Sequence, residues 1–116
     1  MFEPTQMFEL KEFGNVLLLS MTEKRLDASM SNAFKLKLFE LVNNGQHLVL
    51  LDLADVDFID SSGLGVLVSC LKKFASVNGK LVLCGLQPAV VSMFKLTRMD
   101  RVFPIYPDAD SALAVF

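Results

Sequence analysis

The segment HLVLLDLADVDFIDSSGLGVLV (His47–Val68) decides the fold because it joins a strand pattern to a helix pattern. Its first part, His47–Leu53, is a short continuous apolar run, as expected of a strand that is covered on both faces. From Leu64 to Ala75, apolar residues recur along one side of an amphipathic helix. Between the two patterns, the stretch DFIDSSGLG (Asp57–Gly65) places carboxylates, two adjacent serines and two glycines where a strand gives way to a helix.

The rest of the chain continues the alternation of strands and helices. Before this segment, the sequence predicts a hairpin and then a helix that Asp27 or Ser29 caps. After it, the sequence predicts a buried strand, a helix opened by Pro88, an edge strand and a short terminal helix. The corresponding ranges are Gln6–Phe13, Val16–Met21, Met30–Leu41, Lys80–Leu86, Pro88–Met99, Val102–Tyr106 and Asp108–Phe116. The segment Thr22–Ser29 is polar and is expected to be irregular.

This order, β-β-α-β-α-β-α-β-α, predicts one α/β domain over residues 1–116. Strands that alternate with helices imply right-handed crossovers and a mostly parallel sheet, which the first hairpin makes mixed. We therefore expect about five strands and about four helices.

Composition excludes several classes of function. The net charge of −2 and the dispersed Lys and Arg residues argue against a nucleic-acid partner. No apolar run approaches the roughly 20 residues that span a bilayer, and no signal peptide is visible, so we expect a cytoplasmic protein. The two cysteines, Cys70 and Cys84, lie in apolar segments and are predicted to be buried thiols in a reducing compartment.

The acidic and glycine-rich stretch allows ligand binding, but no known ligand motif is complete. A calcium loop counted from Asp55 would need Gly and Glu where Asp60 and Val66 stand. Mg²⁺ held by one or two carboxylates (Asp52, Asp55, Asp57 or Asp60) stays an alternative. Gly63 and Gly65 lack both the third glycine of a dinucleotide site and the Gly-Lys-Ser/Thr of a P-loop, which leaves a looser nucleotide contact. We predict no cofactor and no metal.

The serines allow three further interpretations: nucleophile, helix cap or modification site. A nucleophile needs a base, but the single histidine, His47, precedes a strand that ends before the serines. That strand would separate His47 from them by roughly 20 Å. A phosphate on Ser61, at or just before the helix start, would meet free N–H groups and a favourable dipole. The sequence also allows Ser61 and Ser62 to cap the N-terminus of this helix.

Two segments of the chain resemble the STAS domain family: VDFIDSSGLGVLV (Val56–Val68) and GKLVLCGLQPAVVSMFKLTRMDRVFPIY (Gly79–Tyr106). The resemblance covers nearly the whole chain and is closest to the single-domain anti-sigma factor antagonists of bacteria. RLDAS (Arg25–Ser29) also fits the family's segment before the first helix. One departure is Lys24, where family members often have a glycine.

The resemblance implies a non-enzymatic partner switch. The unphosphorylated antagonist binds an anti-sigma factor that is also a serine kinase, phosphorylation releases it, and a serine phosphatase resets it. Carried onto this sequence, the phosphoacceptor is Ser61. The implied partner surface comprises Asp27, Ser29, Asp60, Ser62, Gly63, Gly65, Val66 and Ser69. The glycines would allow close approach of the partner, and Val66 and Ser69 would lie on an exposed helix side.

The same family implies an alternative role, as a scaffold subunit of a sensory assembly or of a lipid-transport complex without phosphorylation. The oligomeric state is left open between monomer and weak dimer, because an edge strand near the N-terminus could pair with another chain.

Overall fold

The strand and the helix of the opening segment form as predicted. The computed structural model describes residues 7–116, so the predicted strand start at Gln6 lies outside the described residues. Strand β4 spans Leu48–Asp52 and helix α2 spans Ser61–Ala75. Positions 49–51 of β4 are fully buried, as a continuous apolar run requires.

The remaining elements follow the predicted order with three additions. Two-residue strands precede α1 and α2, and a short 3₁₀ turn, Met99–Arg101, follows α3. The bounds are β1 Phe8–Phe13, β2 Val16–Met21, β3 Arg25–Leu26, α1 Ala28–Asn43, β5 Phe58–Ile59, β6 Lys80–Cys84, α3 Pro88–Leu96, β7 Ile105–Tyr106 and α4 Ala109–Leu113.

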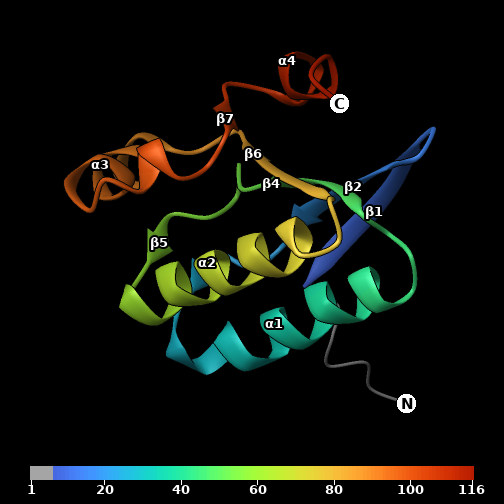
Figure 1. Cartoon of the computed structure of the whole chain (residues 1–116). Helices are drawn as coiled ribbons and strands as arrows, with labels where there is room; N and C mark the ends of the chain where they lie inside the picture. The colour runs from blue at the N-terminus through green and yellow to red at the C-terminus, as the bar shows by residue number, and fades with distance from the viewer. Residues whose placement is uncertain (1–6) are drawn as a thin grey trace.

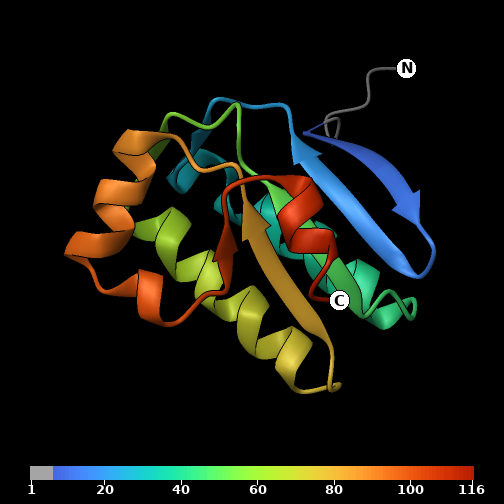
Figure 2. The same cartoon turned by 90° about the horizontal axis from the view of Figure 1, so that it is seen from above.

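The main sheet has the strand order β1-β2-β4-β6-β7. Only β1 and β2 are antiparallel, joined by the Gly14-Asn15 turn, and the other neighbours are parallel. Helices α1 and α2 lie side by side on one face, and the short α4 lies on the other (Figure 1). Seen from above, β1 and β7 form the two edges of the sheet (Figure 2). The predicted fold class is thereby confirmed.

The larger core lies between the sheet and the helix pair α1 and α2. Phe34 of α1 and Phe74 of α2 are fully buried there, next to Leu19 and Leu51 of the sheet. A smaller core on the opposite face joins Leu18 to Ala112 of α4. Strands β2 and β4 are packed on both faces, so the ends of these strands have well-defined positions. The loops that follow these two strands carry the candidate site.

The expectation that Thr22–Ser29 is irregular was wrong, because this segment contains β3. Strand β3 pairs in parallel with β5, and the two form a separate two-stranded sheet. Each strand has only two residues, which is too short to show the alternation that marks a strand in a sequence. The thiols of Cys70 and Cys84 are free and buried, as predicted.

Candidate functional site

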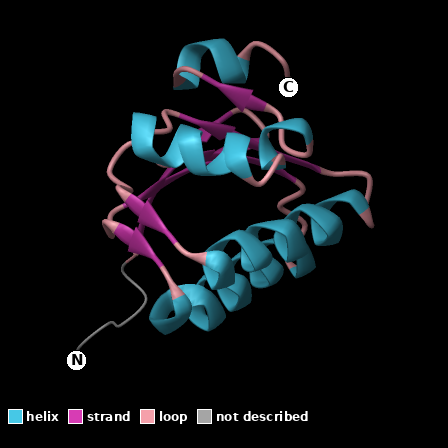
Figure 3. Ribbon diagram, turned by 90° about the vertical axis from the view of Figure 1, so that its left-hand side faces the viewer, coloured by secondary structure: helices cyan, strands magenta, loops and turns pink. Residues whose placement is uncertain are grey.

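The two short strands bring the N-termini of α1 and α2 together. Leu26 of β3 lies opposite Ile59 of β5, and the Asp60 N–H donates to the Leu26 carbonyl at 3.3 Å. The Asp57 N–H donates to the Lys24 carbonyl at 2.8 Å. In Figure 3, the strands run side by side and each leads into its helix. Lys24 does not have a positive φ, so this turn forms without the glycine that many family members have.

The carboxylate of Asp60 bonds to both helices at this junction. Its Oδ1 accepts from the Gly63 N–H at 2.8 Å, which makes Asp60 the N-cap of α2. Its Oδ2 accepts from the Ala28 N–H, in the first turn of α1, at 3.1 Å. Asp60 therefore stabilises the N-termini of both helices at once and holds them next to each other. The alternative that the serines cap α2 is wrong, because Asp60 is the cap.

Asp27 caps α1 and also engages a neighbouring arginine. Its Oδ1 accepts from the Ser29 N–H at 3.1 Å and from the Ser29 hydroxyl at 2.6 Å, while its Oδ2 lies 3.2 Å from Arg25 Nε. The Ser29 hydroxyl first, and the Arg25 guanidinium second, lower the pKa of Asp27 below its ordinary 3.8. The Arg25 guanidinium also stacks 4.1 Å from the ring centre of Phe58.

Ser61 and Ser62 are the first two residues of α2, and both are exposed. Within residues 7–116, neither hydroxyl makes a hydrogen bond, and neither backbone N–H finds an acceptor. Such free N–H groups and the helix dipole favour negative charge at this end of α2. Either hydroxyl can therefore take up an anionic group without breaking a hydrogen bond.

Two residues of the predicted partner surface are not on the surface. Gly63 is buried, and a Cβ there would overlap the Leu26 carbonyl oxygen. Val66 is only 7% exposed, because that side of α2 packs into the core. The expectation that Val66 lies on an exposed helix side was wrong, since α2 is covered on one side by α1 and on another by the sheet. Partner contact by Gly63 and Val66 stays a prediction. Gly65 is exposed and has open space around its Cα, and Ser69 is half-buried.

The acidic residues of the loop do not gather into a metal site. Asp52 accepts from the Ala54 N–H at 2.9 Å, in a turn directly after β4, while Asp60 is occupied at the helix ends. Among the residues that the structure describes, no three His, Cys, Asp or Glu side chains are placed to hold a metal ion. His47 precedes β4, at the end of that strand opposite the loop that leads to Ser61.

Sequence reasoning did not identify the Arg25–Phe58 stack. Phe58 is 37% exposed, although it is a large apolar side chain beside the serines. A shallow cavity of about 420 Å³ adjoins the stack and is lined by residues that include Lys24, Arg25, Asp27 and Met30. The pairing of β3 with β5 brings together Arg25 and Phe58, which are 33 residues apart in the chain, so no local pattern in the sequence predicts the stack.

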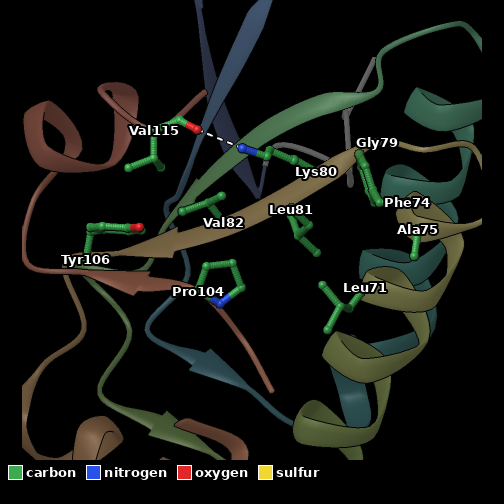
Figure 4. Close-up of a pocket in the computed structure, with 10 residues that line it drawn as sticks. All are labelled: Leu71, Phe74, Ala75, Gly79, Lys80, Leu81, Val82, Pro104, Tyr106 and Val115. Carbon is green, nitrogen blue, oxygen red and sulfur yellow. Dashed lines mark hydrogen bonds between the residues drawn. The ribbon is translucent and has the colours of Figure 1, made fainter. Parts of the chain in front are cut away.

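A second cavity lies away from this junction. It has a volume of about 230 Å³, is mainly apolar, and opens between α2 and the strands β6 and β7 (Figure 4). Leu71, Phe74 and Ala75 line it from the last turns of α2. It is therefore at the other end of that helix from Ser61.

Of the helices that the structure describes, none has the length and apolar character needed to cross a membrane.

Comparison with known proteins assigns the class. A profile of the STAS domain matches residues 7–112, and the chain belongs to the STAS domain family. Several of its relatives are named anti-sigma factor antagonists, a regulatory rather than catalytic group. One is a candidate antagonist of Thermotoga neapolitana, 37% identical over 108 residues that cover 92% of this chain and 95% of the relative.

Solved structures agree with this assignment. The crystal structure of a candidate anti-sigma factor antagonist from Thermotoga maritima matches with a TM-score of 0.85 and 30% identity, over 95% of this chain and 94% of that one. SpoIIAA, an anti-sigma factor antagonist solved in unphosphorylated and phosphorylated forms, has a TM-score of 0.69 in the unphosphorylated form. That match covers 92% of this chain and 94% of SpoIIAA, and at 16% identity it shows a shared fold alone.

Proposed function

We propose that this chain is a phosphorylation-controlled anti-sigma factor antagonist that acts in the cytoplasm. In its unphosphorylated state it binds an anti-sigma factor that is also a serine kinase. Phosphorylation of Ser61 releases it, and a serine phosphatase restores the binding state. The observation that carries the proposal is the exposed Ser61 hydroxyl at the first position of α2, free of any hydrogen bond within residues 7–116.

The proposed docking surface is the exposed part of the helix junction. It comprises Arg25, Asp27, Ser29, Phe58, Ser61, Ser62, Gly65 and Ser69. Phe58 and Arg25 are suited to contribute binding energy, because aromatic and arginine side chains dominate protein interfaces. Asp60 acts behind this surface by holding both helix ends in place.

Phosphorylation would change binding more than it changes the fold. Because the exposed Ser61 hydroxyl makes no hydrogen bond within residues 7–116, adding a phosphate breaks none, and the helix end favours the new charge. A partner seated on Ser61 would have to bury a dianion beside Asp60, which costs several kcal/mol in order of magnitude unless the partner pairs it.

The test is phosphorylation by the cognate kinase with ATP, followed by mass spectrometry. We expect one phosphate on Ser61 in the wild type and none in Ser61→Ala. Ser62→Ala is the matched control, because Ser62 is the adjacent exposed serine of the same helix turn and should leave phosphorylation intact. Phosphate confined to Ser62 would overturn the residue assignment. A chain that the kinase binds but never modifies would favour the scaffold role instead.

A further inference from the structure

The two edges of the main sheet differ in how well they are protected. Strand β7 has only two residues, and it follows Pro104, which has no N–H. At the start of the neighbouring strand β6, the Lys80 ammonium donates to the Val115 carbonyl at 2.7 Å (Figure 4). Strand β1 has six residues in unbroken register with β2, from Phe8 opposite Met21 to Phe13 opposite Val16. It contains neither a proline nor a bulge, which are two of the usual protections of an edge, although it carries the charged residues Glu9, Lys11 and Glu12.

The backbone of β1 presents a regular row of groups at its free side. The Met7 carbonyl accepts from the Thr22 N–H at 2.7 Å, so this pair is hydrogen-bonded. In an antiparallel ladder such pairs alternate, so Glu9, Lys11 and Phe13 also bond to β2. The N–H and C=O groups of Phe8, Leu10 and Glu12 therefore point away from β2, toward the open edge. Leu10 is also 50% exposed.

The side chains of β1 are self-complementary about Leu10. Glu9 and Lys11 flank it and lie on the sheet face that carries α4, because they stand opposite Ser20 and Leu18. If two β1 strands pair antiparallel with Leu10 opposite Leu10, each Glu9 faces the Lys11 of the other strand. These are non-hydrogen-bonded pairs, in which side chains approach most closely. This ion pair therefore forms twice, once on each side of the two-fold axis.

We propose that β1 pairs with β1 of a second copy of this chain, centred on Leu10, to form a two-fold symmetric dimer with one continuous sheet. The interface satisfies the outward N–H and C=O groups of Phe8, Leu10 and Glu12 and covers the exposed Leu10 side chain. It lies on the edge strand of the sheet, apart from the helix junction that carries Ser61.

The negative charge around Glu9 favours a second copy of this chain as the partner of β1. Glu9 shares a surface cavity of about 230 Å³ with Asp52 and Asp55, and none of its lining residues is basic. Three carboxylates in one cavity attract a cation. Lys11 of the second copy supplies one in the proposed register, whereas Lys11 of the same chain lies 5.6 Å from the ring centre of Phe13, toward the hairpin turn.

The test is a charge-swap cycle with the full chain, measured by sedimentation velocity over a wide range of protein concentration. We expect the wild type to shift from monomer to dimer as concentration rises. Lys11→Glu or Glu9→Lys alone should weaken association about tenfold, because symmetry turns two attractive pairs repulsive. The double variant Glu9→Lys with Lys11→Glu should restore it. Lys95→Glu, an equal charge change on exposed α3, should leave it unaltered.

Hydrogen exchange gives a second readout at single residues. Dimerisation should slow exchange of the Leu10 and Glu12 amides as concentration rises, while the Lys11 amide is already bonded to β2 and stays unchanged. Circular dichroism should show that every variant remains folded, since both substituted side chains are exposed. A wild type that is monomeric throughout, a dimer indifferent to the single reversals, or a double variant that fails to recover would each overturn the proposal.

Discussion

Replacing Gly63 by alanine tests whether this glycine serves the fold or a partner. A Cβ at position 63 would overlap the Leu26 carbonyl oxygen and lie 2.9 Å from Ile59 Cγ2. The carbonyl belongs to the backbone of β3 and accepts from the Asp60 N–H, so it cannot rotate away as a side chain would. To make room, α2 must move away from β3, which strains the junction that Asp60 holds. Gly65, two residues along the same helix, has nothing within 4 Å of the corresponding position.

The two substitutions should therefore change stability in opposite directions. Alanine in a helix interior gains about 1 kcal/mol over glycine in either case. At Gly65 this gain stands alone, so Gly65→Ala should stabilise the protein by about 0.5–1 kcal/mol. At Gly63 the overlap costs about 3 kcal/mol or more, since overpacking against rigid backbone lies at the upper end of its range. Gly63→Ala should then destabilise by about 2 kcal/mol.

Urea and thermal unfolding followed by circular dichroism would measure both effects. A domain of this size shifts its Tm by about 4 °C per kcal/mol, so the two variants should differ by roughly 10 °C. The reasoning is refuted if Gly63→Ala is as stable as the wild type, or if Gly65→Ala is the less stable of the two. A Gly63→Ala protein that keeps its stability but loses its partner would return Gly63 to the docking surface.

Three further outcomes follow from the site and the core. Asp60→Ala should lose about 2–3 kcal/mol of unfolding free energy, because the α2 cap and the hydrogen bond to Ala28 disappear, and Asp60→Asn should lose less. Equal unfolding curves for the alanine variant and the wild type would contradict this expectation. The lowered pKa of Asp27 means that its ionised form stabilises the fold, so the stability difference between wild type and Asp27→Asn in urea should shrink as pH falls through and below 3.8. Burial raises the pKa of the Cys70 and Cys84 thiols to about 12, so a thiol reagent at neutral pH should label them only after unfolding, and fast labelling of the native protein would count against this burial.

The longer elements were predictable because their patterns are local. The apolar runs around β4 and β6 and the stripe of α2 reflect burial that each segment shows by itself. Pro88 opens α3, as its residue type indicated, and Asp108 caps α4. The strands β3 and β5 escaped prediction because their two-residue pairing depends on the contact between two distant segments.

The candidate site was predictable only in part for the same reason. The position of Ser61 at the start of α2 followed from the helix pattern. The second hydrogen bond of Asp60, to Ala28 of another helix, has no counterpart in local sequence. The glycine at 63 looked like a feature of partner contact, but its lack of a side chain meets a packing need between α2 and β3. The choice between Ser61 and Ser62 rests on the family resemblance, since both hydroxyls are exposed.

The most direct test of the central claim compares the affinity of the cognate anti-sigma factor kinase for two forms of this chain. One form is unmodified, and the other carries a single phosphate on Ser61. Burial of an unpaired dianion predicts a loss of affinity of roughly a hundredfold or more, with little change in Tm. Equal affinity for the two forms would contradict the proposed switch.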